Sequence, residues 1–179
     1  RKYGSKKPVI TADNKKESDA MCVKPDSIGC KGKVYIIGSG PAGLFAALTL
    51  GKSGFYPIIL ERGECVENRV ETVGNFWNGG VFCPESNIQF GEGGAGTFSD
   101  GKLNSGIKDR HCSRVLKIFA ENGGGDDLLF EAKPHIGSDH LFHTVKSMRK
   151  QIENFGEVKF RHRLTDIIVQ RGALKAIKV

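Results

Sequence analysis

Three closely spaced glycines separate a predicted strand from a predicted helix: Gly38, Gly40 and Gly43. The apolar, β-branched run before them, residues 33–37, is typical of a buried parallel strand. The helix is expected over residues 41–53, because Pro41 fits a first helical turn, where its missing N–H is not needed. A second apolar run, residues 56–60, completes a strand–helix–strand unit of about 30 residues, the length of a parallel crossover. This unit constrains the fold more than any other feature, and it predicts an α/β protein with a parallel sheet.

The spacing of the three glycines suits a turn that binds a dinucleotide. Gly38 permits a tight turn after the strand, Gly40 lets the backbone approach a diphosphate, and Gly43 lets the helix lie close to the sheet. The free N–H groups of the first helical turn then face the negative charge of the ligand. We therefore expect cofactor contacts along the whole turn: Gly38, Ser39, Gly40, Pro41, Ala42 and Gly43. The alternative is a glycine-rich turn that binds nothing.

Glu61 ends the second predicted strand, 23 residues after Gly38. An acidic residue at this place in a dinucleotide-binding unit accepts hydrogen bonds from the hydroxyls of the adenosine ribose. Its charge would repel a 2′-phosphate, so NADP is not expected here. Because FAD and NAD share adenosine, ribose and diphosphate, the spacing alone does not distinguish between these two cofactors.

Longer segments of the sequence resemble known flavoproteins. The stretch GPAGL at residues 40–44 is similar to the glycine turn of the two-dinucleotide-fold flavoprotein superfamily. The stretches CPESNIQFGEGGAGTFSDGKLNSGIKD (83–109) and AKPHIGSDHL (132–141) resemble the bacterial FAD-dependent dehydrogenases, also called NAD(FAD)-utilising dehydrogenases. The resemblance covers about residues 33–179. It implies a Rossmann-like FAD-binding domain and FAD as the cofactor.

A second glycine-rich stretch, residues 91–101, has the composition of a loop whose N–H groups touch an extended ligand. The resemblance implies a place near the ribityl chain and the isoalloxazine ring. The expected cofactor contacts in this stretch are Gly93, Gly94, Gly96 and Thr97. Lys102 would lie near N1 and C2=O of the flavin, where a cation stabilises the reduced ring. The alternative is a mobile surface loop with a solvated lysine.

Three further residues are candidates for cofactor contacts. Arg62 and Arg69 follow the ribose-binding position closely and could reach a pyrophosphate. The alternative for both arginines is a surface ion pair with Glu61, Glu64 or Glu67. Leu164 lies where related flavoproteins place the backbone of a strand against adenine, so the contact would not depend on its side chain.

Three more helices and three more strands are expected after the first unit. The helices are predicted over residues 66–77 and 110–122, and from a cap at Ser138 or Asp139 to residue 154. The strands are predicted near residues 158–163, 165–170 and 173–179, as a small β meander or hairpin. On the first of these helices, four apolar side chains share one face: Val66, Val70, Val73 and Trp77.

Composition divides the chain at about residue 32. Residues 1–32 hold two prolines and few large apolar side chains, so we expect a linker or the end of an upstream segment. Residues 33–179 are expected to be the N-terminal part of an FAD-binding domain. Flavoproteins of this superfamily later add a Gly-Asp segment that contacts the ribityl phosphate, and no such segment occurs before Val179. The resemblance therefore implies an incomplete domain, a fragment of a longer enzyme.

Charge and cysteine content exclude several classes of protein. The net charge is +7, and residues 1–32 supply +4 of it, with eight Lys and Arg against four Asp and Glu. No basic stripe with interleaved aromatic residues follows, so nucleic-acid binding is not expected.

The five cysteines form no C-x-x-C pair, and no apolar run reaches membrane-spanning length, which favours a cytoplasmic protein. His140 and His143 lack a third ligand at helical spacing, so no metal site is expected.

The resemblance implies an FAD-dependent oxidoreductase of the dehydrogenase type, in which a bound flavin transfers a hydride or electrons. The electron donor would be a small molecule or a pyridine nucleotide. Two alternatives stay open: a non-catalytic nucleotide-binding module with structural FAD, and an NAD-dependent Rossmann dehydrogenase. No side chain stands out as a catalytic acid or base, so no catalytic residue is assigned.

Overall fold

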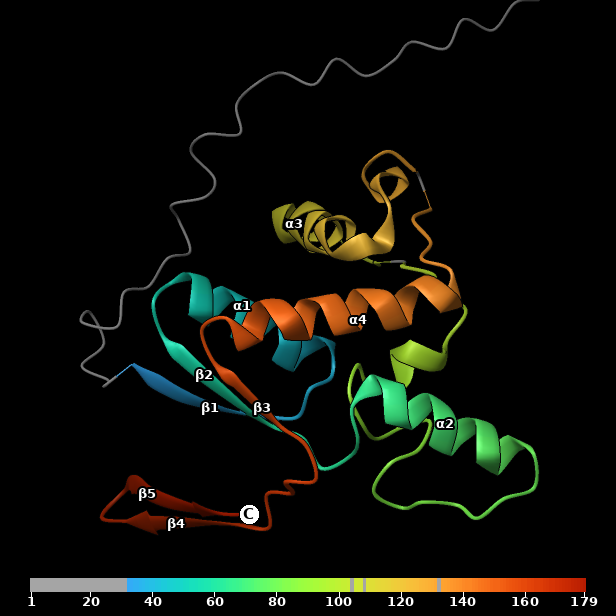
Figure 1. The fold of residues 1–179 in the computed structure, drawn as a ribbon. Coiled ribbons are helices and arrows are strands. Elements are labelled where there is room, and N and C mark those ends of the chain that lie inside the picture. The colour runs from blue at the N-terminus through green and yellow to red at the C-terminus, as the bar shows by residue number, and fades with distance from the viewer. Residues whose placement is uncertain (1–31, 104, 108, 132) are drawn as a thin grey trace, which may run out of the picture.

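A parallel sheet of three strands organises the described part of the chain (Figure 1). The computed structural model describes residues 32–179, except residues 104, 108 and 132. The strands are β1 (Lys33–Ile37), β2 (Tyr56–Leu60) and β3 (Glu157–Lys159), in the order β1-β2-β3. Ile36 of β1 pairs with Ile59 of β2, and Ile59 pairs with Val158 of β3. All three side chains alternate to the same face, which is the apolar face of the sheet.

Helices cover this apolar face. The helices α1 (Pro41–Lys52) and α4 (Ser138–Glu153) lie side by side over it, as Figure 1 shows. Buried apolar side chains, mostly from both helices and from β2, form the main core: Leu44, Ala47, Leu48, Ile59, Val66, Ile118, Val145, Met148 and Ile152. On the opposite face, Tyr35 and Ile37 of β1 are about half exposed. Within the described residues, the sheet is therefore covered mainly on one side.

Two further helices and three short helical turns complete the helical part. The helix α2 (Val66–Trp77) follows β2, and α3 (Arg110–Phe119) packs beyond α4 through the turn η4 (Ala120–Gly124). The other short turns are η3 (Ala95–Phe98) and η5 (Asp126–Leu129). Gly137 is the N-cap residue of α4, and Ser138 is already the first residue of the helix, so the prediction that Ser138 or Asp139 caps this helix is wrong.

The last two strands form a separate hairpin. The strands β4 (Asp166–Gln170) and β5 (Ala173–Lys178) pair antiparallel. Arg171 and Gly172 both have positive φ, 53° and 75°, as a tight two-residue hairpin turn requires. Because β3 pairs with β2 and not with β4, the expected hairpin is confirmed and the expected meander is wrong.

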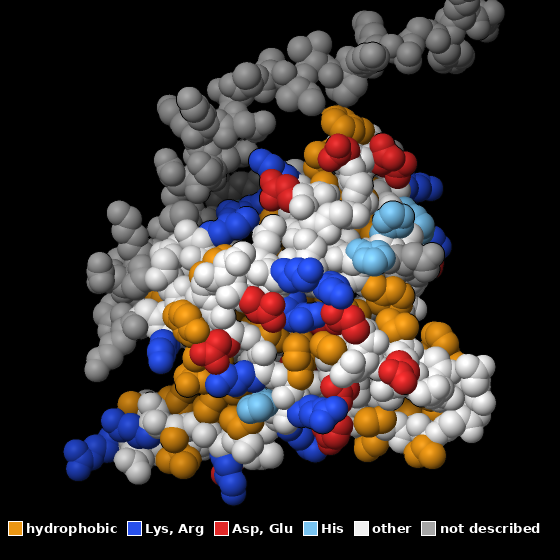
Figure 2. Space-filling model, viewed as in Figure 1, with side chains coloured by type: hydrophobic (Ala, Val, Ile, Leu, Met, Phe, Trp, Pro, Cys, Tyr) orange, Lys and Arg blue, Asp and Glu red, His pale blue; other side chains and the backbone are white. Residues whose placement is uncertain are grey.

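Most predicted elements occur where the sequence pattern indicated, with three differences. The helix expected over 110–122 ends at Phe119, and the turn η4 follows it. The strand expected over 158–163 ends at Lys159, because the N–H of His162 donates to the Glu61 carbonyl and turns the chain along the sheet edge. The helix α2 is confirmed, but only part of its predicted apolar face is covered, because Val66 and Val73 are buried while Val70 and Trp77 are exposed. Exposed apolar side chains lie at the end of α2 and in the segment after it (Figure 2, lower right): Phe76, Trp77, Val81 and Phe82.

The predicted linker, residues 1–32, lies outside the described residues apart from Gly32. Among the described residues, no helix combines the length and the hydrophobicity that a membrane crossing requires.

Candidate nucleotide-binding site

The carboxyl ends of the three parallel strands meet at one edge of the sheet. The N–H of Gly38, just after β1, donates to the Leu60 carbonyl at 2.8 Å. The N–H of Glu61, just after β2, donates to the Lys159 carbonyl at 2.9 Å. This edge is where open parallel sheets bind their ligands. The predicted glycine turn and the predicted ribose-binding residue therefore lie next to each other.

The glycine turn has the backbone that the spacing predicted. Gly38 has a φ of +91°, a conformation that favours glycine. A Cβ on Gly43 would collide with the Gly38 carbonyl oxygen, so the close approach of α1 to β1 requires glycine there. These two predicted roles are confirmed. At Gly40, no described atom lies within 4 Å of the position a Cβ would take, so the turn faces open space.

The N-terminus of α1 has donors available beside this open space. No side chain among the described residues caps the helix, Gly40 is the N-cap residue, and Pro41 has no N–H. The N–H groups of Ala42 and Gly43 belong to the first turn, where the helix supplies no acceptor. Pro41 and Ala42 are exposed. An anion in front of Gly40 would therefore meet two free donors and the positive end of the helix dipole.

Glu61 is 4% exposed and binds the glycine turn directly. Its Oε2 accepts from the N–H and from the hydroxyl of Ser39, both at 2.8 Å, and its Oε1 accepts from the N–H of Gly63 at 2.9 Å. A carboxylate has about four acceptor sites, so one site on Oε1 is left for another donor. Ser39 was predicted to contact the cofactor, but its polar groups bind Glu61 and it is fully buried. Ser39 is thus a residue that orients Glu61.

The second glycine segment, defined here as Gly91–Gly96, packs against the glycine turn. The N–H of Gly93 donates to the Ser39 carbonyl at 2.9 Å. A Cβ on Gly94 would lie 3.4 Å from Cδ of Pro41 and 3.5 Å from Cα of Gly40. Gly96 is exposed and faces open space. The two glycine-rich stretches are therefore neighbours, as a shared ligand would require.

Arg69 is fully buried and holds the second glycine segment in place. Its guanidinium donates to four carbonyl oxygens at 2.7–2.8 Å: those of Asn87, Ile88, Glu92 and Gly94. Burial lowers the pKa of Arg69 to about 10, while Glu61 and Glu92 oppose this shift, so the group stays charged at neutral pH. The prediction that Arg69 reaches a pyrophosphate or pairs on the surface is wrong for this conformation, because its donors are used inside the protein.

Two residues at this site were missed by sequence reasoning, Glu92 and Arg149. The carboxylate of Glu92 is fully buried between the N-terminus of α2 and the side chain of Arg149 on α4. A single acidic residue among glycines was the only available signal for Glu92. Its partner lies 57 residues away, so no local spacing could indicate the pair.

Arg62 and Thr97 were also predicted to contact the cofactor, and both have partners within the protein. Arg62 donates to Glu85 at 2.8 Å and its guanidinium carbon is 4.1 Å from the Phe90 ring centroid, so it pairs with none of the expected carboxylates. Thr97 is buried, and its hydroxyl donates to the Glu92 carbonyl at 3.4 Å, so this hydroxyl already has a partner inside the protein. The predicted contacts of Arg62 with a pyrophosphate stay a prediction.

Lys102 and Leu164 lie at the edges of the site. The Lys102 side chain is 65% exposed and pairs with Asp100 at 2.8 Å, as the alternative of a solvated lysine indicated. Leu164 is half-buried in the segment that follows β3. It lies two residues after His162, whose N–H donates to the Glu61 carbonyl. The roles of both residues toward a flavin stay predictions.

Two cavities lie near these elements. One cavity, of about 60 Å³, lies between the N-terminus of α1 and the second glycine segment. Its lining is mostly apolar and includes Leu44, Thr97 and Met148. Another of about 340 Å³ lies between α2 and residues 82–89, with Phe76, Phe82 and Cys83 in its wall. Neither cavity has the size and position of a complete flavin site.

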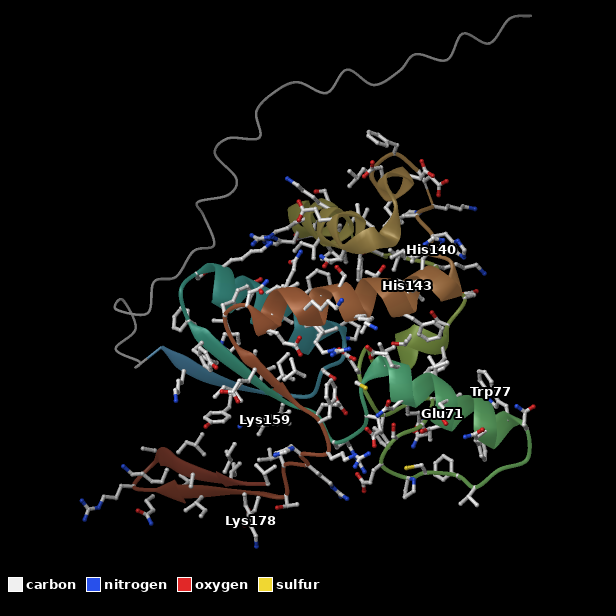
Figure 3. All side chains as sticks on the ribbon, viewed as in Figure 1. Glu71, Trp77, His140, His143, Lys159 and Lys178 are labelled. Atoms are coloured by element: carbon white, nitrogen blue, oxygen red, sulfur yellow. The ribbon has the colours of Figure 1, made fainter. Side chains whose placement is uncertain are left out.

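The two histidines weighed as metal ligands are on the outer surface of α4. Figure 3 shows His140 and His143 one turn apart near the N-terminal end of this helix, and both are exposed. The described residues contain no group of three or more His, Cys, Asp or Glu side chains placed to hold a metal ion.

The sequence was compared with family models and with curated proteins. No family model matches the chain. An uncharacterized protein of Clostridium beijerinckii is 46% identical over 158 residues, which is 88% of this chain and 30% of the relative. The chain thus spans less than a third of the curated relative it matches.

Proposed function

We propose that this chain supplies the Rossmann-like adenosine diphosphate-binding part of an FAD-dependent oxidoreductase. The observation that carries the proposal is the contact between Glu61 and the glycine turn. A buried carboxylate at the carboxyl end of β2 accepts two hydrogen bonds from Ser39, inside the turn that follows β1. The diphosphate of such a ligand is esterified to the 5′-oxygen of the ribose, so the groups that bind the ribose and the diphosphate must be this close.

The residues fit the adenosine diphosphate half of the cofactor. A side chain at Gly40 would fill the space in front of the turn, which a diphosphate can occupy instead. The N–H groups of Ala42 and Gly43 would bind the phosphate oxygens. Oε1 of Glu61 has one free acceptor site for a ribose hydroxyl, and a second hydroxyl could bind only if Ser39 released one of its bonds.

The preference for FAD over NAD rests on the resemblance of residues 83–109 and 132–141 to FAD-dependent dehydrogenases. When bound, FAD would supply the hydride or electron transfer. This chain would bind and orient the adenosine end, and the second glycine segment would continue the binding surface toward the rest of the cofactor. No described side chain is assigned a catalytic role.

The test is the cofactor of the purified full-length protein. We expect a yellow protein that releases FAD on denaturation and whose flavin is reduced by an electron donor such as a pyridine nucleotide. A colourless protein that binds NAD would replace the proposal with the NAD-dependent alternative. A bound flavin that no donor reduces would favour a structural role for FAD.

A matched pair of variants tests the site itself. In Gly40→Val, the new side chain enters open space and the backbone, with φ −67° and ψ 178°, is one that valine adopts, so the fold should persist while FAD is lost. Gly74→Val adds the same side chain in open space on α2 and should retain FAD. Full FAD occupancy in Gly40→Val would refute the site.

A further inference from the structure

Glu92 is the one acidic residue in the second glycine segment, Gly91–Gly96, and its side chain is fully buried. Its Oε2 accepts from the N–H of Val66, the first residue of α2, at 2.7 Å. Its Oε1 accepts from Nε of Arg149 on α4 at 2.9 Å. One side chain thus connects the second glycine segment to two helices. An uncompensated carboxylate would be costly in this position, so both bonds matter to where the segment lies.

Arg149 is itself held in one orientation. Its Nη2 donates to both carboxylate oxygens of Glu67 at 2.8 Å, and its Nη1 lies 3.8 Å from Glu153. Lys146 also pairs with Glu67, at 2.9 Å. Because the guanidinium is a planar fork with fixed donor directions, these contacts fix the place of the Nε–H that Glu92 accepts.

The anchoring of Glu92 acts directly on the glycine turn of the candidate site. The neighbouring N–H of Gly93 donates to the Ser39 carbonyl, and Gly94 packs against Gly40 and Pro41. The backbone N–H of Glu92 also donates to the Glu64 carbonyl at 3.0 Å. A displacement of Glu92 would therefore move the atoms that line one side of the space in front of Gly40.

We propose that Glu92, held by Arg149, is a positioning residue that sets how closely the second glycine segment packs on the glycine turn, and thereby how tightly the turn binds a nucleotide diphosphate. The inference rests on the proposed function, since it concerns the same site. It assigns Glu92 no contact with the ligand. Its effect should appear in binding of the diphosphate and not in binding of the adenosine.

The charges around Glu92 make this arrangement sensitive to pH. Arg149 faces it from α4, and Glu67 and Arg69 face it from α2. Burial raises the pKa of Glu92 to about 7, and the bonds from Val66 and Arg149 oppose the shift. Both carboxylate oxygens accept hydrogen bonds, so a proton on either one weakens a bond that holds the segment. Diphosphate affinity should therefore fall as the pH decreases through about 7.

The experiment measures binding by titration calorimetry to full-length protein from which bound nucleotide has been removed. The probes are ADP and adenosine, and the variant is Glu92→Gln, which keeps the size of the side chain and removes its charge. We expect ADP to bind roughly tenfold more weakly than to the wild type, with adenosine binding unchanged. The matched control is Glu71→Gln, which makes the same change at an exposed position on α2 that takes no part in the contacts of Glu92 or Arg149, and it should leave both affinities unchanged.

A second variant covers the case in which Glu92→Gln does not fold. Arg149→Lys keeps the charge but not the fork of donors, and it should show the same selective loss of ADP affinity. The pH dependence is measured with FAD, whose diphosphate does not titrate near neutrality. FAD affinity of the wild type should fall as the pH decreases through about 7, and Glu92→Gln should not show this fall.

The outcomes separate this inference from the proposed function. If the wild type binds neither ADP nor FAD, the proposed function fails and the inference fails with it. If the wild type binds ADP and the variants bind it equally well, the inference fails and the proposed function stands. An equal loss of ADP and adenosine affinity, or an unchanged pH profile in Glu92→Gln, would also overturn the positioning role.

Discussion

Oε2 of Glu61 accepts two hydrogen bonds from Ser39, one from its N–H and one from its hydroxyl, each 2.8 Å long. The bonds join the residue after β2 to the turn after β1, so they connect two neighbouring strand ends. Glu61 therefore has a structural role in the glycine turn in addition to its proposed role in ribose binding.

The first prediction concerns the charge of Glu61. In Glu61→Gln, one acceptor oxygen becomes an NH₂ group, and a buried donor of Ser39 or Gly63 loses its partner. An unsatisfied buried donor costs about 1–3 kcal/mol, so the free energy of unfolding should fall by that amount in urea titrations. Glu71→Gln, an exposed position on α2 (Figure 3), is the matched control and should change stability little. Equal stability of the two variants would contradict the prediction.

The second prediction concerns the distance between α1 and β1. In Gly43→Ala, the new methyl group meets the Gly38 carbonyl oxygen, and the helix must move away from the strand. Such overpacking costs about 1–3 kcal/mol. Gly74→Ala makes the same change within α2 in open space and should stabilise by up to about 1 kcal/mol, because alanine favours a helix over glycine. Thermal unfolding of both variants checks the opposite signs.

The third prediction concerns the buried guanidinium of Arg69. In Arg69→Lys, a compact ammonium replaces a fork that donates to four carbonyl oxygens, and some of these lose their partner. We expect a loss of about 2–4 kcal/mol in the free energy of unfolding, together with faster hydrogen exchange in residues 87–94. Arg62→Lys, which keeps a half-exposed pair with Glu85, should cost less than about 1 kcal/mol. Unchanged exchange in that segment would show that Arg69 does not hold it.

The fourth prediction concerns acid stability and Glu67. Partial burial favours the neutral form of Glu67, but hydrogen bonds from Lys146 and Arg149 outweigh it and lower the pKa from 4.5 to about 2. Because the folded pKa is lowered, the ionised form stabilises the fold above about pH 4.5, and this contribution is lost as the pH falls toward 2. Glu67→Gln should therefore show a shallower decline of unfolding free energy over that pH range. Parallel curves for wild type and variant would refute the assignment.

Local patterns were sufficient for the first strand–helix–strand unit. The apolar, β-branched runs, the glycine spacing and Pro41 all act within a few residues of one another, so β1, α1 and β2 occur where they were predicted. The same holds for Gly38 and Gly43, whose roles depend on backbone sterics. The pattern on α2 did not indicate that Val70 and Trp77 are exposed, because helical periodicity identifies a stripe of apolar side chains but not whether another element covers it.

The sequence by itself determined the α/β class, the position of the glycine turn and the acidic residue that ends β2, because backbone conformation and short-range periodicity depend on neighbouring residues. Only the tertiary structure decided that the two glycine-rich stretches touch, that Arg69 holds carbonyl oxygens and that Glu92 pairs with Arg149. Those contacts join residues that are far apart in the chain. The sequence contains many carboxylates and arginines that could pair, and only their burial and the directions of their hydrogen bonds in the folded protein show which of them do.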